Sequence, residues 1–162
     1  MSVVLRKPSV DDASQILEWE NDPDNWEVSL NEGEYSLEDI EALIQSLDSD
    51  VSQARYMIDI QGNSVGAIDF YEIQDGSSGV GILVDKSFRR KGIARKALKA
   101  LDTIASHDYQ LNRLFARIDP TNEASIKLFI SAGYFKKDVK EEVKLPNGDY
   151  IQVLIFEKWL KS

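Results

Sequence analysis

Residues 80–94 read VGILVDKSFRRKGIA, a short apolar run that passes through a basic loop into a helical pattern. The apolar run predicts a buried strand. From about Gly92 to Ala105, apolar residues recur at helical spacing and bases fill the other side, which predicts an amphipathic helix. Unpaired N–H groups and the positive end of the helix dipole meet at a helix N-terminus, so this loop predicts a site for a phosphate or diphosphate.

Charge is unevenly distributed along the chain. Seven bases and no acid lie between Lys86 and Lys99, whereas fourteen acids and no base lie between Asp11 and Asp50. The net charge is −9, which leaves −16 outside the basic segment. This pattern indicates an anion held at the basic segment and a cationic partner elsewhere, and it argues against nucleic acid or a membrane surface as partners. The candidate contacts to a cation are Asp22, Asp24, Glu27, Glu32 and Glu34.

Composition limits the class of protein. A chain of 162 residues with 43% hydrophobic content predicts one domain, residues 1–162, with a buried core. The absence of cysteine excludes disulfides, thiolate metal sites and a cysteine acyl intermediate. There is no apolar run long enough for a membrane span and no signal-peptide pattern, so we expect a cytoplasmic protein. No metal site is expected.

The remaining patterns predict a mixed α and β architecture. Helices are expected from Asp11-Asp12, from Ser36 to Leu47 and over 122–132, where Gly133 ends the last one. Hairpin signals occur at Gly62-Asn63, at 76–79 and at 146–148. The strands are expected at 56–60, 65–71, 80–84, 114–118, 138–145 and 149–158. An order of roughly ααββββαβαββ predicts an α/β (α+β) fold with a mixed sheet and helices on both faces.

Three segments together resemble one family. Residues 89–94 match the signature [QR]-x-x-G-x-[GA] of the GNAT family of N-acetyltransferases. Residues 82–85 are similar to that family's fourth strand, and residues 122–129 with Gly133-Tyr134 are similar to its second motif. Residues 19–23 resemble the branch of ribosomal-protein N-terminal and spermidine acetyltransferases. The resemblance implies a GNAT-like mixed, mostly antiparallel sheet with a splayed central parallel strand pair.

The resemblance also implies acetyl-CoA (coenzyme A) as cofactor. Backbone of residues 82–84 would pair with the pantetheine arm and direct an N–H at the thioester carbonyl, which stabilises the oxyanion. The basic loop would surround the diphosphate, and Asn122 would bond the pantetheine. The candidate cofactor-binding residues are Ile82, Leu83, Val84, Arg89, Arg90, Lys91, Gly92, Ile93, Ala94, Arg95, Asn122, Ser125, Lys127 and Phe129.

The catalytic acid and base depart from the family pattern. Many relatives carry a tyrosine that protonates the leaving thiolate where this chain has Phe129, so Ser125 and Tyr134 are the candidate acids. Many relatives also carry a glutamate at the start of the fourth strand, where this chain has Gly79.

The nearest carboxylates in sequence to that strand are Asp69 and Glu72, which are the candidate bases, acting through a water. Strand alternation places Asp69 opposite the face of Ile68 and Phe70, where it can line a groove. His107, the single histidine, is expected to be a helix-end residue without a catalytic role.

These observations predict an acetyl-CoA-dependent N-acetyltransferase. Direct attack in a ternary complex would acetylate a primary amine of a polyamine, a protein N-terminus or an amino sugar. Two alternatives stay open at this point: a non-catalytic acyl-CoA-binding or sensor domain, and a phosphopeptide or nucleotide binder. The strands after Gly133 could pair across a homodimer. The sequence leaves the acceptor and the acyl chain length open.

Overall fold

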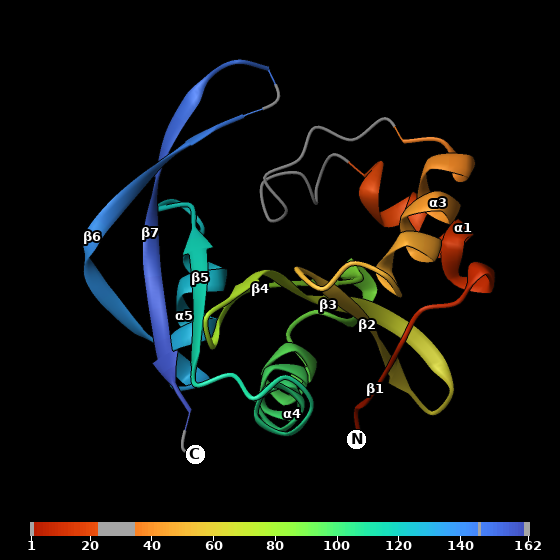
Figure 1. Cartoon of the computed structure of the whole chain (residues 1–162), viewed down its shortest axis with the longest axis horizontal. Helices are drawn as coiled ribbons and strands as arrows, with labels where there is room; N and C mark the ends of the chain where they lie inside the picture. Colours follow the sequence, from red (N-terminus) through yellow and green to blue (C-terminus); the bar gives the residue numbers. More distant parts are fainter. Residues whose placement is uncertain (1, 23–34, 146, 161–162) are drawn as a thin grey trace.

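A computed structural model describes residues 2–22, 35–145 and 147–160, in which one seven-stranded sheet has the order β1-β2-β3-β4-β5-β7-β6 (Figure 1). Neighbouring strands of this sheet are antiparallel, except that β4 and β5 are parallel. The strands are β1 (Val4–Arg6), β2 (Ala54–Ile60), β3 (Asn63–Gln74), β4 (Ser77–Val84), β5 (Arg113–Ile118), β6 (Phe135–Lys144) and β7 (Tyr150–Trp159).

Helices cover both faces of the sheet, as predicted. The helices are η1 (Val10–Asp12), α1 (Ala13–Glu20), α3 (Leu37–Leu47), η3 (Lys86–Phe88), α4 (Ile93–Asp108) and α5 (Glu123–Ser131). Figure 1 shows α1 and α3 on one side of β2 and β3 and α4 on the other. Alternation in β2 explains this arrangement, because Tyr56 and Ile58 pack with the α4 core while Met57 packs against α1 and α3.

Several predicted elements are confirmed by their local chemistry. Helix α3 begins at a capping box in which Ser36 Oγ accepts from the Asp39 N–H at 3.1 Å and Asp39 accepts from the Ser36 N–H at 3.0 Å. Helix α4 begins directly after Gly92, whose φ of 76° favours glycine.

Other predictions were wrong in detail. Strand β1 was not predicted, because three residues are too few for a periodic signal. Three strands, rather than four, lie between α3 and α4 among the described residues. Residues 77–79, which were predicted as a turn, are the first residues of β4. The turn is made instead by Asp75 and Gly76, whose φ values are 51° and 78°.

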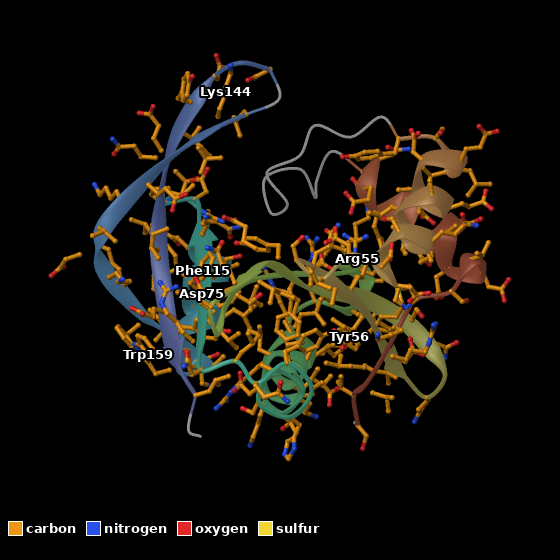
Figure 2. The ribbon with its side chains drawn as sticks, viewed as in Figure 1. Arg55, Tyr56, Asp75, Phe115, Lys144 and Trp159 are labelled. Carbon is orange, nitrogen blue, oxygen red and sulfur yellow. The ribbon has the colours of Figure 1, made fainter. Side chains whose placement is uncertain are left out.

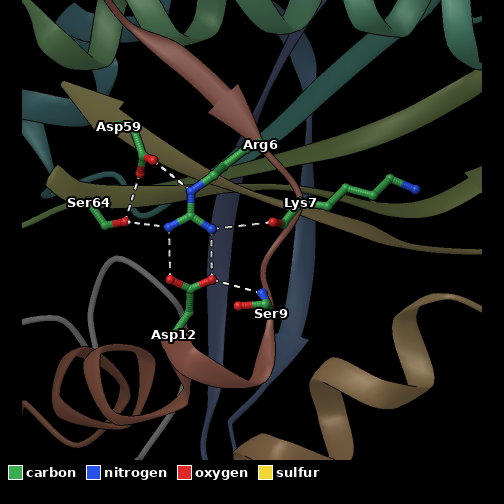
Figure 3. A network of polar contacts seen from close by, with 6 residues as sticks. All are labelled: Arg6, Lys7, Ser9, Asp12, Asp59 and Ser64. Carbon is green, nitrogen blue, oxygen red and sulfur yellow. Dashed lines mark hydrogen bonds and ion pairs between the residues drawn. The ribbon is translucent and has the colours of Figure 1, made fainter. Parts of the chain in front are cut away.

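Asp12, near which the first helix was expected to begin, instead lies in the short helix η1 that precedes α1. Its carboxylate accepts from the Ser9 N–H at 2.8 Å, which caps η1, and makes no side-chain cap for α1 (Figure 3). Arg6 donates to both Asp12 oxygens, at 2.8 and 2.9 Å, and to Asp59 at 2.6 Å. The Arg6 guanidinium holds the pKa of Asp12 below its ordinary value. Through Arg6, this network joins β1 to η1, where the acidic stretch of residues 11–50 begins, and to β2.

Within the described ranges, no helix is both long and apolar enough to cross a bilayer. The same ranges contain no group of three or more His, Asp or Glu side chains placed to hold a metal ion.

Candidate active site

The parallel strands β4 and β5 separate after a short paired stretch. Only residues 77–79 of β4 pair with residues 113–115 of β5, although both strands are fully described and continue beyond that point. A cavity of about 470 Å³ lies where they diverge, lined by residues 80–83 of β4 and 116–118 of β5. The predicted splayed parallel pair is therefore confirmed, and it leaves one edge of β4 without its β5 partner.

Helix α5 forms the wall of the cavity next to β5. Asn122, Ser125 and Phe129 line it, and their spacing of three and four residues places them on one helix face. Asn122 Oδ1 accepts from the Ser125 N–H at 3.1 Å, so Asn122 is also the N-cap of α5. Lys127 lies on the exposed side of the same helix and does not line the cavity.

The opposite wall is charged and comes from α1, β2 and β3. Arg55 donates to the two oxygens of Asp69 at 2.8 and 3.1 Å and lies 3.5 Å from Glu20. Trp19 and Tyr35 complete this end. Figure 2 shows Arg55 on this side of β4, with Phe115 of β5 on the other. The sequence reasoning predicted Asp69 here but missed Glu20 and Arg55.

The basic loop follows β4 directly. Arg89 Nε donates to the Val84 carbonyl at 3.0 Å, and Lys91 lies 5.5 Å from the ring of Phe88. Arg90, Lys91 and Gly92 are exposed at the N-terminus of the sixteen-residue helix α4, which has no acid in its first turn.

This loop can accommodate a diphosphate at the helix N-terminus. A Cβ added at Gly92 would meet no atom within 4 Å, so the approach to the helix N-terminus is open and a positive φ alone requires glycine there. Arg95 is exposed one turn into the helix, which adds a further base to this end. Open backbone N–H groups and exposed bases together suit an anionic ligand.

A comparison with known protein families identifies the family of this chain. The acetyltransferase (GNAT) domain matches residues 2–134 of the chain. The chain belongs to the GNAT family. This membership confirms the predicted class of enzyme, an N-acetyltransferase that uses acetyl-CoA.

Two curated N-acetyltransferases from bacilli are similar to this chain. The uncharacterized N-acetyltransferase p20 of Bacillus licheniformis is 24% identical over 161 residues, which cover 95% of this chain and 90% of that protein. The probable N-acetyltransferase YjcK of Bacillus subtilis is 28% identical over 88 residues, which cover 52% of this chain and 48% of that protein.

Solved structures share the fold. A spermidine N-acetyltransferase from Vibrio cholerae, in complex with CoA and spermine, has a TM-score of 0.87 at 20% identity and covers 98% of this chain and 95% of its own. The aminoglycoside acetyltransferase AAC(6')-Ib, in complex with ribostamycin and coenzyme A, has a TM-score of 0.80 at 21% identity, with coverages of 98% and 94%. The GNAT architecture predicted from the sequence is therefore confirmed.

The four candidate catalytic residues are divided by the structure. Asp69 and Ser125 line the cavity of this GNAT domain. Glu72 is exposed, is paired with Arg117 and lies outside the lining, so its predicted role as a base lacks support from the geometry.

Tyr134 is likewise away from the cavity. It is 3% exposed in the core beside Phe129, and its hydroxyl has no hydrogen-bond partner among the described residues. Burial raises the pKa of Tyr134 above its ordinary value, so the group keeps its proton but does not face the cavity.

The candidate cofactor residues are also divided. Ile82, Leu83, Asn122, Ser125 and Phe129 line the cavity. Ile93 and Val84 are core residues instead, and Ala94 is partly buried against that core. The backbone of Val84 still contributes, because its carbonyl holds Arg89.

Sequence reasoning missed Arg117, and it placed Tyr71 on the same strand face as Asp69 without naming it a site residue; both line the cavity between β3 and β5. The predicted alternation of Tyr71 and Asp69 on one face of β3 agrees with the structure, in which both line the cavity.

Proposed function

We propose that this GNAT enzyme acetylates a primary amine of a polycation, which is either a polyamine or an amino sugar. The amine attacks acetyl-CoA directly within a ternary complex. The single observation that carries this proposal is the cavity at the β4–β5 splay, which joins an open strand edge to a wall where the carboxylates of Glu20 and Asp69 flank Arg55. Acetyl-CoA supplies the acetyl group at that edge, and the acceptor enters from the side of α1 and α3.

Cofactor binding is proposed along β4 and its loop. The backbone of residues 82–84 faces the splay and is free of β5, so it can accept an extended pantetheine arm as an added strand. Asn122 and Ser125 lie across the cavity from it. Arg90, Lys91 and Arg95 surround the open N-terminus of α4, where the diphosphate would be held, and Lys127 is exposed at the outer side of α5.

The charge of the acceptor side supports a cationic substrate. The described residues from 11 to 22 and from 35 to 50 contain ten acids and no Lys or Arg. Asp24, Glu27, Glu32 and Glu34, also predicted to attract the acceptor, lie outside the described residues. Asp22 is 3.8 Å from Lys86, so that part of its charge is offset. Acidic walls raise the local concentration of a cation and lower its escape rate.

Direct attack follows from the residues available. The chain has no cysteine to carry an acetyl group. An amine has an ordinary pKa near 10.4, so it must lose a proton before it attacks. Asp69, held by two bonds from Arg55, is the carboxylate proposed to accept that proton through a water. The GNAT structures that share the fold were solved with spermine or an aminoglycoside, which suggests which acceptors to test.

Initial-velocity kinetics test the proposal. Spermidine, spermine, an aminoglycoside, a peptide with a free N-terminus and a neutral monoamine are compared at several acetyl-CoA concentrations. We expect intersecting reciprocal plots and a preference for the polycations. Glu20→Gln removes a carboxylate from the wall and is expected to raise the acceptor KM roughly fivefold, about 1 kcal/mol.

The matched control is Glu38→Gln. It removes the same charge from the same acidic stretch, residues 11–50, at an exposed residue outside the cavity. We expect it to change the acceptor KM less than twofold. Binding of acetyl-CoA without transfer to any amine would contradict the proposal and favour a sensor. A preference for the peptide would move the acceptor to a protein N-terminus. Association into a homodimer is not tested by these assays and stays a prediction.

A further inference from the structure

Tyr71 occupies a space on the cavity floor that glycines leave open. In the β3–β4 register, Tyr71 lies directly opposite Gly79, and Asp69 lies opposite Gly81. A Cβ added at Gly79 would be 2.3 Å from Tyr71 Cε2 and 2.4 Å from Cζ. The ring therefore fills the volume that any side chain at residue 79 would take. Where relatives often carry a glutamate, this chain presents a phenol from the neighbouring strand.

The ring is held in this place by three elements. A β-bulge between Tyr71 and Gln74, with a φ of 50° at Glu72, turns this end of β3. The fully buried Ser78 Oγ lies 3.1 Å from the Tyr71 carbonyl oxygen and 2.8 Å from that of Gly79, so its single proton is shared between the two carbonyls. On the β5 side, the ring of Phe115 meets Tyr71 edge to face at 5.9 Å. The phenol is therefore positioned by the surrounding fold and does not depend on a bound ligand for its place.

The other hydroxyl groups around the splay are less suited to donate a proton to a leaving group. Phe129 carries none, and the Tyr134 hydroxyl is outside the cavity lining. Tyr35 is a second phenol in the lining, but it lies at the α1 end of the cavity, where its backbone bonds the Asn21 side chain, and it is 38% exposed. Ser125 lines the cavity, but an aliphatic hydroxyl is a far weaker acid than a phenol, whose ordinary pKa is about 10. We propose that Tyr71 is a catalytic residue that donates its phenolic proton to the departing coenzyme A sulfur and recovers a proton from the attacking nitrogen.

The proton balance of the step is complete. The ammonium first loses one proton, through a water, to Asp69 and then to solvent. The amine nitrogen then forms a bond to the acetyl carbon, the bond from that carbon to sulfur breaks, and the Tyr71 hydroxyl hydrogen moves to sulfur. The second proton of the nitrogen returns to the Tyr71 oxygen, so the enzyme ends in its starting state with an amide and a thiol as products.

The charges around Tyr71 suit both the protonated phenol that donates to sulfur and the phenolate that then accepts a proton from nitrogen. Burial raises the pKa of Tyr71 above its ordinary value, so the resting group is protonated at neutral pH. The Arg117 guanidinium opposes that shift, and its Cζ lies 5.6 Å from the ring centroid. A cation beside the ring stabilises the transient phenolate. Glu72, which is paired with Arg117, and the buried Tyr134 are the other titratable groups that interact with Tyr71.

Tyr71→Phe tests the assignment, which rests on the acetyl transfer proposed above. The variant keeps the ring over Gly79 and removes only the hydroxyl. A positioned acid contributes about 10²–10⁴-fold, but a thiol with a pKa near 8.5 is already a good leaving group, so we expect kcat to fall by about 10–100-fold. The affinity for acetyl-CoA, measured by calorimetry, should change less than twofold. Tyr150→Phe, at an exposed residue of β7 outside the cavity, is the control and should leave both values unchanged.

A second readout does not depend on turnover. Burial raises the pKa of Tyr71, so alkaline absorbance titration of folded Tyr71→Phe should show one fewer late phenol transition than the wild type. An unchanged kcat in Tyr71→Phe would show that the ring is only structural and overturn this inference, while leaving the acetyl transfer intact. A fall in acetyl-CoA affinity that accounts for the whole loss would overturn it too. If the wild type acetylates no amine, the proposed function itself fails, together with this step.

Discussion

Gly79→Ala is the substitution for which the structure supplies the most direct magnitude. Three atoms of the Tyr71 ring would lie 2.3, 2.4 and 2.7 Å from the new Cβ, so the ring has to move by about 1 Å or more to reach ordinary contact. Overpacking of this kind costs about 1–3 kcal/mol. Displacing the ring from Phe115 costs about 0.5–1.5 kcal/mol more. Replacing glycine by alanine at a compatible φ raises the free energy of unfolding by about 0.4–1 kcal/mol, because the unfolded chain has less conformational entropy.

The net expectation is a loss of about 2 kcal/mol in the free energy of unfolding. For a chain of this length, that corresponds to a fall in Tm of about 4–8 °C. Urea unfolding and thermal melts of Gly79→Ala check this value. Gly81→Ala is the matched control, because it lies on the same face of β4 and its Cβ would come only within 4.0 Å of the ring. We expect that control to be as stable as the wild type or slightly more stable.

A double-mutant cycle identifies the ring as the cause. Tyr71→Ala removes the ring and opens the space, so the Gly79→Ala methyl should cost about 1–2 kcal/mol less in that background. Additive effects of the two substitutions would refute the packing argument. A wild-type stability for Gly79→Ala, or an equal loss in Gly81→Ala, would refute it as well and would show that the ring adjusts without cost.

Three further predictions concern the cofactor, the N-terminal network and the acceptor. The double variant Arg90→Ala, Gly92→Glu should lose at least about tenfold in acetyl-CoA affinity by calorimetry, because each charge-assisted bond contributes about 1.5–3 kcal/mol. The control Lys99→Ala, farther along α4, should keep its affinity. Retained affinity in the double variant would place the cofactor elsewhere. Arg6→Met should lower the free energy of unfolding by about 2 kcal/mol at pH 7, a value reduced because Arg6 is 38% exposed. Arg6 depresses the pKa of Asp12, so the ion pair stabilises the fold above about pH 4, and this stabilisation is lost as the pH falls through the pKa of Asp12 in the folded protein. If Arg6→Met lowered the free energy of unfolding in urea equally at pH 3 and pH 7, the pairing would be contradicted. Finally, 0.5 M salt should raise the KM of a polycationic acceptor more than that of a neutral amine, and equal effects would argue against an acidic acceptor wall.

Much of the fold was predictable because its signals are local. The capping box at Ser36, the helical period after Gly92 and the cap at Asn122 each depend on residues within one or two turns of each other. The same is true of the basic loop, whose bases and glycine are consecutive in the chain. These features predicted the GNAT family, and a cofactor region at the basic loop, before any tertiary contact was known.

The acceptor side was predicted less well because it depends on strand register. Counting outward from the hairpin, where Ile60 pairs with Asn63, would place Arg55 opposite Ile68. A bulge between Ile58 and Asp59 shifts the pairing by one residue and places Arg55 opposite Asp69 instead. No residue pattern in β2 announces that bulge, so the ion pair at the cavity wall was not visible in the sequence.

The sequence by itself therefore determined most of the order of the elements, the place of the basic loop before α4 and the absence of a cysteine nucleophile, because each depends on residues that are adjacent or absent in the chain. Only the tertiary structure decided which groups meet across the splay. The separation of β4 from β5 opens the cavity, and the approach of β3 to two glycines of β4 places Tyr71 in it. The physical reason is that strand pairing joins residues by register and bulges, which are set by packing over the whole sheet.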